Sequence, residues 1–109
     1  MTTTFKNWNI EAETGYTPIT TFYMDFSIAD RFGLSAIKDT YRRGLETAKF
    51  LGYKELTEFV LVLNWKIWEH YNRNNVYAKL YNDIWMEAND IARKTLQGDE
   101  LMYFYQTTD

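Results

Sequence analysis

The chain is 109 residues long, the length of one domain, and it carries a formal net charge of −3. Aliphatic and aromatic residues are abundant enough for a globular fold, and 18% of the residues are aromatic. The lack of cysteine excludes a disulfide framework, thiol catalysis and cysteine-ligated metal sites. We therefore expect a single domain over residues 1–109.

The sequence shows neither a leader peptide nor a membrane span. The first thirteen residues lack the basic region and the apolar stretch of a secretory signal peptide. The longest unbroken apolar run, Phe59–Leu63, is far shorter than the roughly 20 residues that a membrane-spanning helix needs. We expect a cytoplasmic protein that has no membrane contact.

The N-terminal part of the chain lacks a helical period. Residues 22–26 alternate in the manner of a short strand, residues 4–10 are a second candidate strand, and residues 15–18 between them are typical of a turn. An isolated hairpin is marginal in water, so it must pack on something else. We predict that residues 1–26 form an extended or hairpin arm on a helical bundle of residues 27–109.

Apolar residues at helical spacing predict three long helices, over residues 36–51, 56–71 and 76–96. A short helix should precede them with Ser27 as its cap, Ser35 should cap the first long helix, and Asp99 should cap a short final helix. Short connections favour antiparallel packing of neighbours. The predicted fold class is mainly α, a small bundle of three long helices and one or two short ones.

The middle helix is apolar around most of its circumference, which is typical of a helix at the centre of a bundle. Asn64 lies within its apolar stripe. A buried amide without partners costs roughly 1–3 kcal/mol, so this side chain must find a hydrogen bond. Asn64 either fixes the packing of the core or faces a ligand in a pocket.

Val62 and Trp65 interrupt the polar face of the same helix. Aromatic side chains are enriched at interfaces, and a large exposed one is costly unless it is covered. Either the N-terminal arm covers these two residues, or a second subunit or another partner does. Together with Tyr103, Phe104 and Tyr105 near the C-terminus, they form the candidate interaction surface.

The sequence offers few catalytic groups. His70, the only histidine, directly follows Glu69, so the two lack the Glu-x-x-His spacing of a bridged metal site, and we expect an ordinary surface or helix-end histidine. Asp83, Glu87 and Asp90 share a helix face and could hold Mg²⁺ or Ca²⁺, but neighbouring basic residues favour a solvated charged face. We expect no catalytic residue, no metal, no cofactor and no enzymatic activity.

One segment is basic. Residues 31–54 carry six basic and two acidic side chains. Its candidate phosphate contacts are Arg31, Lys38, Arg42, Arg43 and Lys49. Two acids on the same helix partly neutralise this face, so nucleic acid is the alternative partner rather than the expected one.

The strings DFSIADRFG and AIKDTYRR, then ELTEFVLVLNWKIWEHY and the ending MYFYQTTD, resemble a group of small uncharacterised proteins of gut Bacteroides-type bacteria and their phages or mobile elements. The resemblance covers most of residues 22–109. It implies a phage-like or mobile-element context, in which small accessory proteins commonly act by binding another macromolecule.

These patterns lead to two hypotheses of different classes. The first is a non-enzymatic accessory or protein-interaction module whose partner is another protein or a second copy of the chain, as in a homodimer. The alternative is a nucleic-acid-associated regulator that uses the basic helix of residues 36–51.

Overall fold

The computed structural model describes residues 18–71 and 75–108, and this part of the chain is helical apart from the short connections between helices. The five helices of the described residues are α2 (Pro18–Asp30), α3 (Leu34–Leu51), α4 (Tyr53–His70), α5 (Asn75–Thr95) and α6 (Gly98–Thr108). The predicted mainly α fold is therefore confirmed. The candidate strand at residues 4–10 and most of the proposed arm lie outside the described residues.

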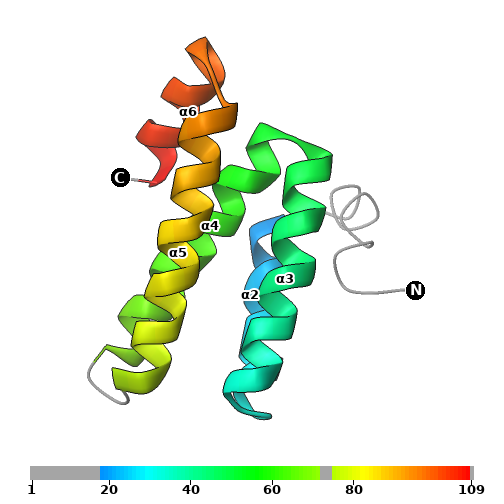
Figure 1. The fold of residues 1–109 in the computed structure, drawn as a ribbon, viewed down its shortest axis with the longest axis vertical. Coiled ribbons are helices and arrows are strands. Elements are labelled where there is room, and N and C mark those ends of the chain that lie inside the picture. The colour runs from blue at the N-terminus through cyan, green and yellow to red at the C-terminus, as the bar shows by residue number, and fades with distance from the viewer. Residues whose placement is uncertain (1–17, 72–74, 109) are drawn as a thin grey trace.

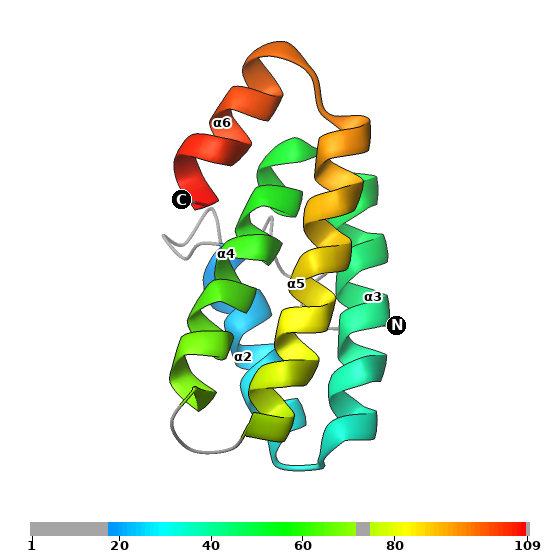
Figure 2. The ribbon, with the colours of Figure 1, turned by 60° about the vertical axis from the view of Figure 1, so that its left-hand side comes forward.

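Helix α4 is the centre of the bundle and packs against each of the other four described helices. Successive helices α3, α4 and α5 run antiparallel, as Figures 1 and 2 show, and α6 folds back along α4 after the turn at Gly98. The predicted antiparallel packing is thus present. None of α2–α6 combines the length and apolar character that crossing a bilayer requires.

Aromatic rings fill the contact between α2 and α4. The Phe22 ring meets Phe59 edge-on at a centroid distance of 5.2 Å, and Phe26 packs on Phe59 at 5.8 Å and on Tyr81 at 5.5 Å. All four side chains are fully buried. Each such ring contributes roughly 1.5–3 kcal/mol through burial, so these contacts hold α2 firmly on the bundle.

The strand predicted at residues 22–26 is wrong, because these residues lie within α2. Phe22 and Phe26 are four residues apart, which places both on one face of a helix as readily as on one face of a strand. Met24 between them is exposed on the opposite side. Burial against α4 decides between the two periods, and the bundle therefore includes residues 18–26 as well.

The predicted serine caps are also wrong. Ser27 lies in the last turn of α2, and its hydroxyl accepts a hydrogen bond from Lys66. Helix α3 begins at Leu34, before Ser35, and Gly33 is its N-cap without a side-chain hydrogen bond. Asp99 lies inside the first turn of α6, where its charge favours the helix dipole.

A single residue, Gly52, joins α3 to α4. Its N–H donates to Ala48 O, which closes α3, and its carbonyl accepts from Leu56 N, which opens α4. Its φ of 130° and ψ of −170° belong to a region that is essentially restricted to glycine. The second helix therefore starts at Tyr53, directly after the glycine and earlier than the predicted start at residue 56.

We expect Gly52→Ala to lower the free energy of unfolding by about 1–3 kcal/mol, because the backbone conformation disfavours a Cβ. The added Cβ would meet only Glu55 Oε1 at 3.6 Å, an ordinary contact, so backbone strain is the dominant effect. Gly98→Ala is the matched control, since φ there is +60°, which other residues tolerate at lower cost. Urea unfolding of both variants measures their free energies of unfolding, and we expect the larger loss for Gly52→Ala. An equal loss of stability in the two variants would contradict the prediction.

Candidate functional site

A lysine is buried among charged and polar side chains where α4 meets α2. The Lys66 side chain is only 1% exposed, and its Nζ lies 2.7 Å from Asp30 Oδ2 and 2.6 Å from Glu69 Oε1. It also donates to Ser27 Oγ at 3.3 Å. Two carboxylates and a hydroxyl thus satisfy the three protons of the ammonium group.

His70 belongs to the same group of side chains. Its Nε2 lies 3.0 Å from Asp30 Oδ2, so Asp30 bridges Lys66 and His70. The imidazole stacks on the rings of Tyr77 and Tyr81 from α5, at centroid distances of 5.4 and 5.6 Å. His70 is the last residue of α4, so the predicted helix-end position is confirmed. Its side chain is only 13% exposed, because α2 and α5 lie on both sides of it, so it is not a surface histidine.

Two tyrosines complete the group. Tyr81 donates its hydroxyl proton to Asp30 Oδ1 at 2.5 Å, and Tyr23 donates to Glu69 Oε2. The Lys66 ammonium lies 5.0 Å from the ring centre of Tyr23 and 5.8 Å from that of Tyr81, within cation–π range. We call the following residues the Lys66 cluster: Tyr23, Ser27, Asp30, Lys66, Glu69, His70 and Tyr81.

These contacts fix the charged states of the cluster. Burial lowers the pKa of Lys66, but the hydrogen bonds and charges of Asp30 and Glu69 outweigh it and raise the pKa overall. Burial raises the pKa of Glu69, and the bonds from Lys66 and Tyr23 reverse this, so that the pKa is lowered. The hydrogen bond to Glu69 raises the pKa of Tyr23, and burial followed by the bond to Asp30 raises that of Tyr81.

Three members of the cluster have the composition of a metal site. Asp30, Glu69 and His70 bring one ligand atom each within 4.8 Å of one another. The Lys66 ammonium, however, already bonds to an oxygen of each of the two carboxylates that would ligate an ion. A second cation between these oxygens would meet strong repulsion at short range. The arrangement is therefore that of an internal ion pair.

The candidate interaction surface does not form one exposed patch. Val62 and Phe104 are fully buried, so their prediction as surface residues is wrong; α4 has neighbours around most of its circumference, which leaves Val62 no free side. Tyr103 is half-buried and meets Tyr53 edge-on at 5.4 Å. Trp65 and Tyr105 remain partly exposed.

The Asn64 side chain forms a hydrogen bond within the chain. Its Nδ2 donates to the Thr108 carbonyl at 3.2 Å, which ties the end of α6 to the middle of α4. The side chain is half-buried. This bond favours the packing role of Asn64 over that of a ligand-facing amide.

A surface hollow lies beside the Lys66 cluster. It has a volume of about 530 Å³ and is lined by Tyr23, Trp65, Trp68 and Glu69. The Tyr23 and Trp65 rings meet edge-on at 6.2 Å. Trp65 is 46% exposed and Trp68 is 82% exposed, so both indoles present apolar surface to solvent. We call these four residues the aromatic hollow.

Trp68 is missing from the candidate interaction surface that the sequence predicts. The available signal was the spacing of Trp65, Trp68 and Glu69, which puts all three on one side of a helix. Tyr23 could not be added to them while residues 22–26 were interpreted as a strand. Tyr23 lines the hollow because residues 22–26 belong to the helix α2.

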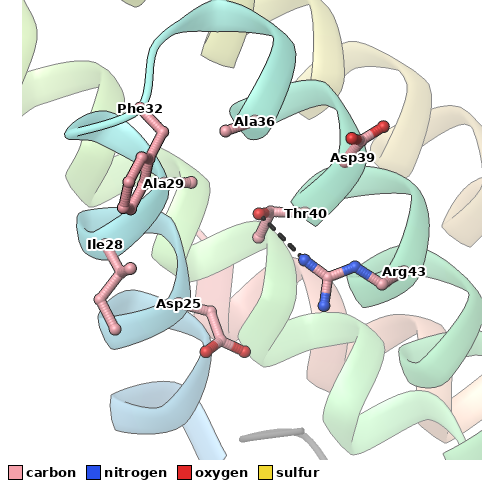
Figure 3. A pocket seen from close by; sticks show the side chains of 8 residues that line it. All are labelled: Asp25, Ile28, Ala29, Phe32, Ala36, Asp39, Thr40 and Arg43. Carbon is pink, nitrogen blue, oxygen red and sulfur yellow. Dashed lines mark hydrogen bonds between the residues drawn. The ribbon is translucent and has the colours of Figure 1, made fainter. Parts of the chain in front are cut away.

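A second, smaller hollow of about 250 Å³ lies between α2 and α3. Figure 3 shows Asp25 of α2 and Arg43 of α3 near one end, and Phe32 near the other. The Arg43 guanidinium donates to Thr40 Oγ1 at 3.4 Å. Acidic and basic side chains both line this hollow, so its charge favours neither an anionic nor a cationic ligand.

The candidate phosphate contacts are all exposed: Arg31, Lys38, Arg42, Arg43 and Lys49. Acidic residues of α3 accompany them, since Arg42 lies 3.5 Å from Asp39 and Lys49 lies 3.5 Å from Glu46. The basic helix therefore presents a face of mixed charge.

The acidic line on α5 is exposed and paired with lysines. Lys79 Nζ lies 3.6 Å from Asp83, and Lys94 Nζ lies 2.9 Å from Asp90. Glu87 is exposed on the same face. These contacts are those of a solvated helix face, where such pairs contribute little to stability.

Comparison of the chain with protein-family models, with curated protein sequences and with solved structures finds no match. The functional interpretation therefore depends on the geometry of the Lys66 cluster and of the aromatic hollow beside it.

Replacing Lys66 by Met removes the ammonium and leaves two carboxylates facing each other. Removing one partner of a buried ion pair costs about 3–5 kcal/mol, and we expect about 3 kcal/mol in urea unfolding because Glu69 is partly exposed. Adding Asp30→Asn and Glu69→Gln removes the uncompensated charges and should restore much of the loss. An equal loss in the single and triple variants would show that lost packing, not charge, is responsible.

Alkaline pH should destabilise the fold through Tyr81. Its pKa is raised above the ordinary 10.0, so the folded chain keeps a proton that the unfolded chain loses. This contribution is complete below pH 10 and is lost as the pH rises, by up to about 1.4 kcal/mol per pH unit. Tyr81→Phe should therefore lose less stability than the wild type between about pH 8 and about pH 11. If Tyr81→Phe loses as much stability over this range as the wild type does, the assignment to Tyr81 is wrong.

Proposed function

We propose that the chain is a non-enzymatic protein-interaction module and that it binds another protein through the aromatic hollow. The observation that carries this proposal is the exposure of Trp68, 82%, next to the partly exposed Trp65. Tryptophan is among the residues that most often dominate binding energy at protein interfaces. Covering half of one indole contributes roughly 2 kcal/mol.

The base of the hollow supports this role because it is rigid. Tyr23 is held by its hydrogen bond to Glu69, and Glu69 is held by the buried Lys66 ammonium. These contacts connect α2 and α4 directly beneath the exposed indoles. A surface whose groups are already ordered loses less conformational entropy when a partner binds.

The charged states of the Lys66 cluster favour a structural role over catalysis. A general acid or base works best with a pKa near the operating pH. The pKa of Lys66 is raised and that of Glu69 is lowered, which moves both away from neutrality. The same ion pairs explain both shifts, and they leave the ammonium protonated and the carboxylate charged.

Trp68→Ala should abolish partner binding without unfolding the chain, because the side chain is largely solvent-exposed. The matched control is Phe50→Ala, which removes an 88% exposed ring from α3. The measurement is affinity capture from native lysate with the three proteins side by side, with thermal unfolding as the check on folding. A protein retained by the wild type and by Phe50→Ala, and lost with Trp68→Ala, is the expected result.

Equal capture by Trp68→Ala and the wild type would contradict the proposed surface. Light scattering on the purified chain separates a second possibility, in which the occupant is another copy of the chain. A dimer mass that Trp68→Ala alone converts to a monomer mass would replace the separate partner with self-association.

A further inference from the structure

We infer that the aromatic hollow receives the guanidinium group of an arginine side chain from the partner protein. This inference depends on the proposed function and specifies the chemistry that the hollow recognises. It is based on three properties of the described residues: the carboxylates at or behind the hollow, the helix end beside it and the openness of its aromatic walls.

Two carboxylates lie at or behind the hollow. Asp30 and Glu69 share the Lys66 ammonium, and Asp30 also lies 3.0 Å from the His70 imidazole. Glu69 belongs both to this group and to the wall of the hollow, and its side chain is 31% exposed. Each of its oxygens already accepts one hydrogen bond and has a further lone pair for a second donor.

The end of α4 lies beside the hollow. Trp68 and Glu69 lie in the last turn of α4, which ends at His70. The C-terminal end of a helix carries a partial negative charge from its unpaired carbonyls, and a cation is stabilised there. A positively charged group entering the hollow therefore meets the Glu69 carboxylate within the last turn of the helix, where a cation is favoured.

The walls provide flat aromatic surfaces for such a cation. Tyr23 already faces the Lys66 ammonium, which lies 5.0 Å from its ring centre. The indoles of Trp65 and Trp68 are therefore the surfaces expected to take a second cation, and tryptophan is the best aromatic partner for one.

The openness of the hollow distinguishes arginine from other cations. With Trp68 82% exposed, the hollow is too open to enclose and dehydrate a compact ammonium group. A guanidinium group is planar, more weakly hydrated than an ammonium group, and able to stack on an indole while its N–H groups bond a carboxylate. Arginine can thus contact an indole and Glu69 at once.

The test uses N-acetyl-arginine N-methylamide and the citrulline compound of the same shape, which lacks the charge. Both are titrated into the full chain while NMR follows the indole N–H signals. We expect saturable shifts of the Trp65 and Trp68 signals with the arginine compound, and binding about fivefold weaker with the citrulline compound. Trp85 is the internal reference, because it lies on α5 and outside the hollow.

Variants and a third probe sharpen the result. The shift at Trp65 should be lost with Trp68→Ala and kept with Phe50→Ala. Equal binding of the citrulline compound would overturn the inference, as would equal binding of the corresponding lysine compound. Shifts of the same size at Trp85 would show general rather than local binding and would also overturn it.

The outcomes separate this inference from the proposed function. If Trp68→Ala abolishes protein capture while the arginine and citrulline compounds bind alike, the interaction module stands and the arginine inference is wrong. If arginine binds selectively but Trp68→Ala still captures the partner, the hollow does not receive the partner's side chain, and both are overturned.

Discussion

The Lys66 ammonium of α4 is buried against side chains of α2 and α5. An ammonium group that is 1% exposed must be compensated within the protein, because its desolvation costs several kcal/mol. Asp30 from α2 and Glu69 from α4 provide the charges, and Tyr81 from α5 bonds to Asp30 in turn. One charge on the central helix thus determines where two neighbouring helices must lie.

The same constraint shapes the surface above it. Glu69 is the link, since one oxygen bonds to Lys66 inside the protein and the other accepts from Tyr23 at the wall of the aromatic hollow. The orientation of an exposed site is therefore fixed by a buried ion pair. Positioning residues below a surface keep its exposed groups in one geometry, which favours selective binding.

The long helices could be predicted from the sequence because each has one wide apolar stripe at helical spacing. Helix α2 could be predicted only from Ser27 onward, because Phe22 and Phe26 fit both periods and only their contact with Phe59 in α4 decides between them. The Tyr23 side chain of the Lys66 cluster lies in the part of α2 that was missed. Asp30 and Ser27 are distant from Lys66 in sequence, and no local sequence pattern indicates that their side chains contact Lys66.

The surface residues were predictable only in part, for a related reason. A helical projection indicates which side of α4 is apolar, but not how many neighbours cover it. Val62 is covered by the surrounding helices, whereas Trp68, at the end of α4, is not. Burial along a central helix thus changes with position along its axis as well as around it.

The contacts of Asp30 also bear on how the chain folds. The bond from Tyr81 to Asp30 spans 51 residues and that from His70 spans 40, whereas α2, α3, α4 and α5 also pack as consecutive neighbours. Contacts between distant parts of a chain form late during folding. The intervening chain must lose conformational entropy before the contact can stabilise the fold. The bonds that join Asp30 of α2 to α4 and α5 should therefore form after the packing of consecutive helices, α2 on α3 included, and their formation is the step that removes the Lys66 charge from water.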